Sequence, residues 1–345
     1  VNFSGNDYLG MSNNPNVLNK VKGELSNYGV GAGGAALLSG RAQIHDDLEK
    51  ELALFTGFED ALLFSSGYLA NLGSIPAITK RDWLIAHDRL NHASLIDAVQ
   101  ASNCKHYRYP HLSHNPVSVI PNSKQSKPCL VVTDSVFSMD GDVIDANSLY
   151  KNCMKKNYFL YIDDAHGFGV INEGSGISRD IDSADKKNVS VMITLGKSLG
   201  AAGALILGTR ELIEYLRQVS RTFIYDTALP PIIAAAALEA LQLLKSDSSY
   251  IDKLNFNIDH FLSECKNYNI PVKQSKTPIQ PIVIGNSHKT LELALNLQKK
   301  GFFVKAIRPP TVPKGTSRIR LTLSSVHSKE QITSIISEIS KLLRT

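Results

Sequence analysis

Two short apolar runs, each ending in chemically active side chains, constrain this chain more than any other feature. Residues 191–194 lead into Lys197, which stands in a glycine-flanked loop, and residues 158–162 lead into Asp163 and His166. Apolar runs of this length that end in glycine and polar residues are typical of buried strands. Parallel neighbouring strands open their carboxyl ends at one edge of the sheet. We therefore expect Asp163 and Lys197 to face one cavity of an α/β fold.

The chemistry of this pair is specific. Most lysines are solvated surface residues, but small apolar neighbours lower the pKa of a lysine by desolvation and leave a reactive amine. Such an amine forms a Schiff base with a carbonyl compound. Pyridoxal phosphate requires a lysine for its aldehyde and a carboxylate that keeps its pyridine nitrogen protonated. Lys197 and Asp163 thus point to this cofactor.

Other strand ends add polar groups to the same predicted edge. The β-rich run at residues 129–133 is followed by Ser138, and Thr194 closes the run before Lys197. Taken alone, Ser138 is equally well explained as a turn hydroxyl bonded to its own backbone. Three successive strands ending in such residues favour a site over chance.

An anion-binding turn is predicted further upstream. A strand at residues 60–64 is followed by small residues and a helix start at Gly67 and Tyr68, whose amides can bind a phosphate. The glycines at 29–34 match a dinucleotide-binding motif by spelling, but a predicted helix at 17–28 precedes them where that motif requires a strand. We interpret them as an active-site loop.

Composition bounds the class of protein. The 345 residues, 43% hydrophobic and 20% charged, predict a large domain at 1–244 and a smaller one from 245 to 345. A net charge of +5 without a dense basic block gives no reason to expect a nucleic-acid partner, and no apolar run reaches membrane-spanning length. The four scattered cysteines predict neither a metal site nor disulfides and fit a cytoplasmic protein. Because the chain begins in mid-motif, we expect a leading segment to precede it.

Several motifs in order, from residues 2–10 through Asp163 and Lys197 to residues 318–323, carry a family resemblance. The chain resembles the α-oxoamine synthases, a group of fold-type I pyridoxal-phosphate enzymes that join an amino acid to an acyl thioester with loss of carbon dioxide. The resemblance implies a mostly parallel seven-stranded sheet flanked by helices, a smaller α+β domain, and an N-terminal segment 1–40 packed at the active site.

The resemblance also implies roles for individual residues. Lys197, Asp163, His92 and His166 would be catalytic, with the His92 ring stacked on the cofactor, and Thr194 would bind its phosphate with Gly67 and Tyr68. His166 would contact its phenolic oxygen, and Ser138 would contact either that oxygen or His166. Tyr225 and Thr227 would reach the partner's phosphate in a homodimer with shared active sites.

The substrate residues implied lie near the two chain ends. Arg320, helped by Asn6, would bind the substrate carboxylate, although a strand arginine is more often a surface charge; Thr311 would contact the acyl substrate. The proline-rich stretch 306–313 is closer to the branch that uses L-alanine and a pimeloyl thioester, carried by coenzyme A or a carrier protein, than to the glycine branch. Asp134–Ser135 and Asp226 depart from the residues usual at their positions.

Three alternatives remain open on sequence alone. Another α-oxoamine synthase could use glycine, serine or a different acyl chain with the same motifs. An aminotransferase would use Lys197 equally well. A non-catalytic partner subunit could keep the fold, but it would have no need to retain Lys197, Asp163 and His166 together.

Overall fold

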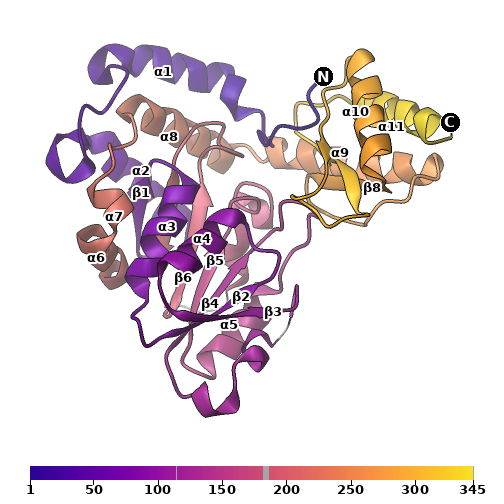
Figure 1. The fold of residues 1–345 in the computed structure, drawn as a ribbon. Helices are drawn as coiled ribbons and strands as arrows, with labels where there is room; N and C mark the ends of the chain where they lie inside the picture. Colours follow the sequence, from indigo (N-terminus) through magenta and orange to yellow (C-terminus); the bar gives the residue numbers. More distant parts are fainter. Residues whose placement is uncertain (114, 182–185, 345) are drawn as a thin grey trace. The chain divides into compact units, whose positions relative to one another are not determined.

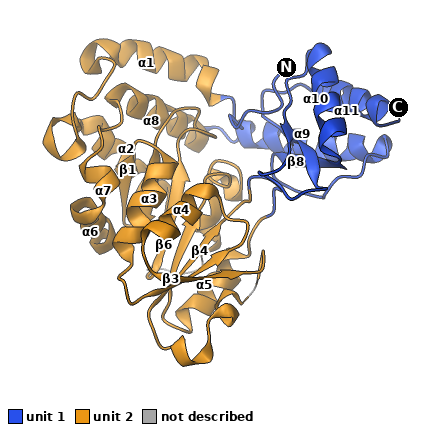
Figure 2. Cartoon of the chain, in the orientation of Figure 1, with its two compact units in different colours: residues 1–10, 138–142, 247–345 blue, residues 11–137, 143–246 orange. Residues whose placement is uncertain are grey.

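The computed structural model describes residues 1–113, 115–181 and 186–344. Two compact units divide the chain, as Figure 2 shows. Unit 2 consists of residues 11–137 and 143–246, and unit 1 consists of residues 1–10, 138–142 and 247–345. The division therefore differs from a single cut after residue 244, because two short segments from the first half of the sequence join the C-terminal part.

A seven-stranded sheet forms the centre of unit 2, counted over the described residues, with the order β1-β7-β6-β5-β4-β2-β3 (Figure 1). Its strands pair in parallel except β7, which is antiparallel to both of its neighbours. Its strands are β1 Asp60–Phe64, β2 Leu84–Asp88, β3 Lys105–Tyr109, β4 Cys129–Asp134, β5 Phe159–Asp163, β6 Val189–Thr194 and β7 Ala204–Gly208. The predicted α/β fold class is confirmed.

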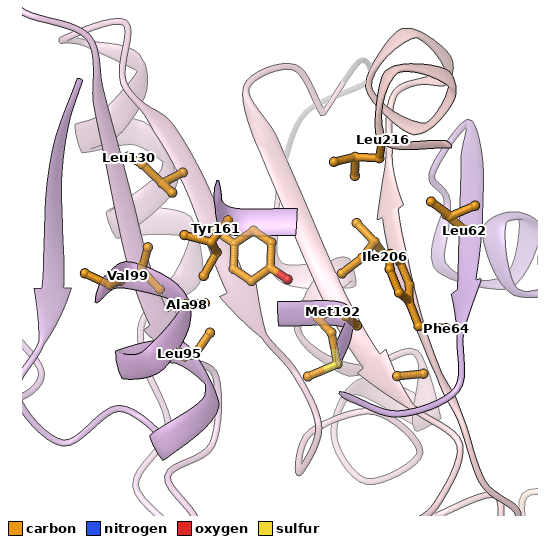
Figure 3. Packing of buried hydrophobic residues seen from close by; sticks show 14 of the residues in the cluster. Leu62, Phe64, Leu95, Ala98, Val99, Leu130, Tyr161, Met192, Ile206 and Leu216 are labelled. Carbon is orange, nitrogen blue, oxygen red and sulfur yellow. The ribbon is translucent and has the colours of Figure 1, made fainter. Parts of the chain in front are cut away.

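Helices flank this sheet and bury one of its faces in a continuous apolar cluster (Figure 3). Leu130 of β4, Tyr161 of β5, Met192 of β6 and Ile206 of β7 project into the cluster from neighbouring strands. The helices of unit 2 are α1 Pro15–Tyr28, α2 Gln43–Thr56, α3 Gly67–Ile78, α4 Ala93–Ala101, α5 Ala146–Met154, α6 Arg210–Val219, α7 Arg221–Ile224 and α8 Pro231–Ser246. Strands β4 to β7 are buried on both faces, which explains why they read as continuous apolar runs in the sequence.

Unit 1 holds an antiparallel sheet with the order β8-β10-β9 and the helices that pack on it. Its elements are β8 Ile279–Gly285, β9 Ala306–Ile307, β10 Ser317–Thr322, α9 Ser249–Asn267, α10 Ser287–Lys299 and α11 Lys329–Arg344. The N-terminal residues belong here because the amide of Thr322 donates to the carbonyl of Phe3, and the amide of Phe3 donates to the carbonyl of Phe303.

Two further properties concern the whole chain. Within the described ranges, we find no helix with the length and apolar character needed to cross a membrane. The four cysteines, Cys104, Cys129, Cys153 and Cys265, are buried free thiols. Burial raises the pKa of three of these thiols, including Cys129, to about 12, so they remain protonated packing residues.

Candidate active site

Asp163 and Lys197 line the same cavity of about 190 Å³ in unit 2. Asp163 is the last residue of β5, and Lys197 follows the end of the neighbouring parallel strand β6 by three residues. The two chain segments therefore leave the sheet at the same edge, as the sequence predicts. A carboxylate and a primary amine in one cavity supply an acid–base pair and a nucleophile.

The carboxylate of Asp163 is held from two sides. Its Oδ2 accepts a hydrogen bond from Asn71 Nδ2 at 2.8 Å, and its Oδ1 accepts one from the main-chain amide of Ala165 at 3.0 Å. The side chain is almost completely buried. A carboxylate that accepts on both oxygens has a fixed orientation, which suits a group that must meet a ring nitrogen.

His92 is the N-cap residue of α4 and also lines the cavity. Its main-chain amide donates to Asp134 Oδ2 at 2.8 Å, and its Nδ1 lies 2.8 Å from Ser94 Oγ. Asp134 is itself fully buried on the cavity wall, and burial together with the nearby charge of Asp163 raises its pKa. The unusual Asp134 thus positions the backbone of the histidine.

The neighbouring departure, Ser135, serves a second buried carboxyl group. Ser135 Oγ donates a hydrogen bond to Asp164 Oδ1, and the amide of Ile177 donates to Asp164 Oδ2 at 2.8 Å. Burial raises the pKa of Asp164 to about 7. Asp164 lies next to Asp163 in sequence but is absent from the described cavity lining, so the two carboxyl groups have separate surroundings.

The predicted anion-binding turn also borders the cavity. Ser66 caps α3, and Gly67 and Tyr68 open the helix with their amides at its N-terminus. A Cβ atom at Gly67 would lie 3.3 Å from Met192 Cε, so a larger residue would crowd this wall. Thr194 and the nearly buried His166 complete the lining.

Together these residues match the chemistry of pyridoxal phosphate. A fixed carboxylate suits the pyridine nitrogen, an amine suits the aldehyde, and a helix N-terminus with a hydroxyl group suits the phosphate. The described residues contain no group of three or more histidine, cysteine, aspartate or glutamate side chains that could hold a metal ion.

Arg320 and Asn6, the predicted carboxylate-binding pair, lie together in unit 1. Arg320 Nη1 and Nη2 donate to Asn6 Oδ1 at 3.4 and 3.3 Å, and its Nε donates to the main-chain oxygen of Ser138. The Arg320 side chain is 8% exposed, and no carboxylate among the described residues lies within ion-pair distance of it. Its neighbour on the same strand face, Arg318, is paired with Asp140 at 2.5 Å.

Besides Asn6 and Arg320, four predicted site residues are absent from the lining of the Lys197 cavity. Ser138 belongs to unit 1, where its carbonyl accepts from Arg320, and Thr311 is exposed in the same unit. Tyr225 is 72% exposed, and Thr227 lines a smaller pocket together with Asp226, whose carboxylate accepts from Ser65 Oγ. Their predicted roles remain predictions.

Sequence reasoning did not single out Asn71, Ser94 or Tyr161. Asn71 is fully buried and contacts Asp163, Ser94 and the hydroxyl of Tyr161. The available signal was weak: an amide inside a strongly apolar helix, and a serine two residues after a histidine at a helix start. Neither pattern indicates a contact with a residue about 90 positions away.

Comparison with known proteins identifies the family of this chain. Residues 1–339 match the family model for aminotransferase class I and II. The chain belongs to this family. A relative from Saccharophagus degradans, an 8-amino-7-oxononanoate synthase, is 40% identical over the whole chain and 87% of its own length. The enzyme of the same name from Pseudomonas savastanoi pv. phaseolicola is 42% identical over 96% of this chain and 83% of its own length.

Solved structures of two named enzymes are similar to this chain in fold. The 8-amino-7-oxononanoate synthase from Francisella tularensis superimposes with a TM-score of 0.85 at 29% identity, covering the whole of this chain and 98% of that one. A serine palmitoyltransferase from Sphingomonas wittichii gives a TM-score of 0.91 at 27% identity over the whole of this chain and 87% of that one. Fold alone therefore does not separate these two activities.

Proposed function

We propose that the chain is an 8-amino-7-oxononanoate synthase of biotin biosynthesis. It joins L-alanine to a pimeloyl thioester, releases carbon dioxide and the free thiol, and depends on pyridoxal phosphate. The observation that carries this proposal is the convergence of Asp163 and Lys197 on one cavity. The identity of 40–42% to synthases of this name, along nearly the whole chain, selects the reaction within the family.

The cofactor, when bound, supplies a ring that accepts the electron pair left by the bond broken at the amino-acid α-carbon. Asp163 is proposed to hold the proton on the pyridine nitrogen, and the amides of Gly67 and Tyr68 with the Thr194 hydroxyl are proposed to bind the phosphate. Lys197 would hold the aldehyde of the cofactor, and its amine would serve as the general base for the α-proton. His166 and Ser138 are proposed partners of the phenolic oxygen.

Arg320 and Asn6 are proposed to bind the carboxylate of alanine. The support is electrostatic: a nearly buried guanidinium that lacks a carboxylate partner among the described residues carries an uncompensated charge, which is costly unless an anion binds. Its donors reach the uncharged groups of Ser138, Asn6 and Tyr8, so its positive charge remains available to an anionic ligand. Thr311 is proposed to contact the acyl substrate, carried by coenzyme A or a carrier protein.

A homodimer is proposed as the active form, with Tyr225 and Thr227 reaching the partner's cofactor phosphate. The support lies in large apolar side chains that unit 2 exposes. Tyr225 is 72% exposed, and Val30 and Leu38 in the glycine-rich segment and its continuation are 81% and 86% exposed. A backbone bridge between Ala35 and Thr227 brings the two segments together, and an exposed apolar patch commonly marks an interaction surface. We also propose a cytoplasmic location, which suits the four free thiols.

Product analysis tests the reaction. Purified protein with pyridoxal phosphate, alanine and pimeloyl-coenzyme A should yield a product with the mass of 8-amino-7-oxononanoate. Serine palmitoyltransferase is the second candidate, favoured by the TM-score of 0.91, and serine with a long-chain acyl thioester tests it directly. Turnover of serine but not alanine would replace the first proposal with the second.

The Lys197→Ala variant tests the site itself. Loss of the general base should lower kcat by about 10²–10⁴-fold, measured as thiol release. Lys186→Ala is the matched control, because Lys186 is also partly buried, with a pKa lowered to about 8 by burial, but donates to the carbonyl of Thr56 outside the cavity. Wild-type turnover by Lys197→Ala would refute the assignment.

A further inference from the structure

A buried chain of hydrogen bonds connects Asp163 with the imidazole of His92. Asn71 Nδ2 donates to Asp163 Oδ2 at 2.8 Å and to Ser94 Oγ at 2.9 Å, and Ser94 Oγ lies 2.8 Å from His92 Nδ1. On the other side of the Asn71 amide, the Tyr161 hydroxyl donates to Asn71 Oδ1 at 2.8 Å. Figure 3 shows the Tyr161 ring inside the apolar cluster, and this packing fixes the position of the hydroxyl that Asn71 contacts.

We propose that Asn71 and Ser94 are positioning residues that fix the proton of neutral His92 on Nε2. The argument begins with the amide of Asn71. As an ionised carboxylate, Asp163 can only accept, so the Asn71 atom that faces it must be the NH₂ group. The remaining amide atom is then the oxygen, which accepts the single proton of Tyr161. The contacts with Asp163 and with Tyr161 thus require the same orientation of the Asn71 side-chain amide.

Ser94 connects the oriented amide of Asn71 to His92 and determines which ring nitrogen accepts a hydrogen bond. Ser94 Oγ accepts from Asn71, so its only proton is available for His92 Nδ1. The main-chain amide of Ser94 also donates to Nδ1, at 3.3 Å, as part of the N-cap of α4. With two donors directed at it, Nδ1 must carry a lone pair. The proton of the neutral ring is therefore on Nε2.

The consequence concerns what His92 can do in the cavity. With Nδ1 engaged by the protein, its other ring nitrogen, Nε2, is a hydrogen-bond donor. His92 can therefore offer a proton to a substrate oxygen, whereas accepting a proton on Nδ1 would require breaking its bond to the Ser94 amide and turning the serine hydroxyl. The inference rests on the proposed function, because it concerns the same site. The tautomer of His92 can nevertheless be measured in protein that is not turning over substrate.

Nitrogen NMR of protein labelled with [¹⁵N]histidine tests the inference directly. The signals of His92 are assigned by their loss in His92→Phe. In wild-type protein, with and without pyridoxal phosphate, we expect a pyridine-type Nδ1 and a protonated, pyrrole-type Nε2. A protonated Nδ1 in the neutral ring would overturn the proposal. Binding of pyridoxal phosphate is followed separately by its visible absorption, so a failure of the proposed function would remain distinguishable.

Ser94→Ala removes the hydroxyl donor and should lower the ratio of the two tautomers about fivefold, the effect of one net hydrogen bond. Ser178→Ala is the matched control, because Ser178 is a fully buried serine at residues 176–180 whose hydroxyl has no partner among the described residues. Asn71→Ala should shift the His92 signals in the same direction as Ser94→Ala. Identical His92 signals in Ser94→Ala and Ser178→Ala would also overturn the proposal, even if Asn71→Ala failed to fold.

Discussion

The charged groups of the two units are positioned in different ways. In unit 2, Asp163 and Lys197 stand where parallel strands end, and the sheet itself brings them to one cavity. In unit 1, Arg318 and Arg320 stand inside strand β10 and are buried by the segments around them. A strand end can be read from the sequence, whereas the burial of a strand interior depends on what the rest of the chain places over it.

The comparison predicts the largest effect for the strand-end carboxylate. Asp163→Asn removes the negative charge proposed to hold the pyridine proton, so kcat should fall by about 100-fold or more while pyridoxal phosphate still binds. Steady-state thiol release and cofactor absorption measure the two properties. Asp164→Asn is the control, since Asp164 contacts Ser135 and Ile177 and is absent from the described cavity lining. Equal losses in both variants would remove the distinction between the two aspartates.

A smaller effect is expected for the strand-interior arginine. Arg320→Lys keeps the charge but loses the planar fork, so KM for alanine should rise about 10-fold or more. Arg318→Lys should change KM little, because its charge is already compensated by Asp140. Steady-state kinetics with varied alanine measure both variants. If Arg318→Lys raises KM as much as Arg320→Lys, ion pairing does not distinguish the two positions.

A third effect concerns stability. Burial raises the pKa of Asp164 from 3.8 to about 7, so the folded state binds its proton more tightly than the unfolded state does. Between these two values unfolding releases this proton, and the free energy of unfolding falls as pH rises, by up to about 1.4 kcal/mol per pH unit. Asp164→Asn should lose this slope in urea titrations across that pH range. Parallel pH profiles for variant and wild type would show that Asp164 does not titrate there.

The sequence was sufficient to predict those site residues that stand at or just after the end of a strand. Asp163, Thr194 and Lys197 were predicted correctly at one sheet edge because continuous apolar runs and following glycines mark such ends. A strand arginine is more often a surface charge, yet the whole of β10, Arg320 included, is buried. Asn71 could not be predicted because its partners are chosen by packing of α3 on the sheet, which leaves no periodic trace in the sequence.

The union of the first residues with β10 also bears on when the protein can form its proposed carboxylate site. Asn6 and Arg320, whose side chains meet in unit 1, are separated by 314 positions. On the ribosome, residue 6 emerges long before residue 320 has been synthesised, and its backbone must wait for the strand that receives it. The Lys197 cavity depends on much earlier residues, since its lining ends at position 197 and strand β7, which joins β6 to β1, ends at Gly208. During synthesis, the Lys197 cavity should therefore form before the Asn6–Arg320 pair does.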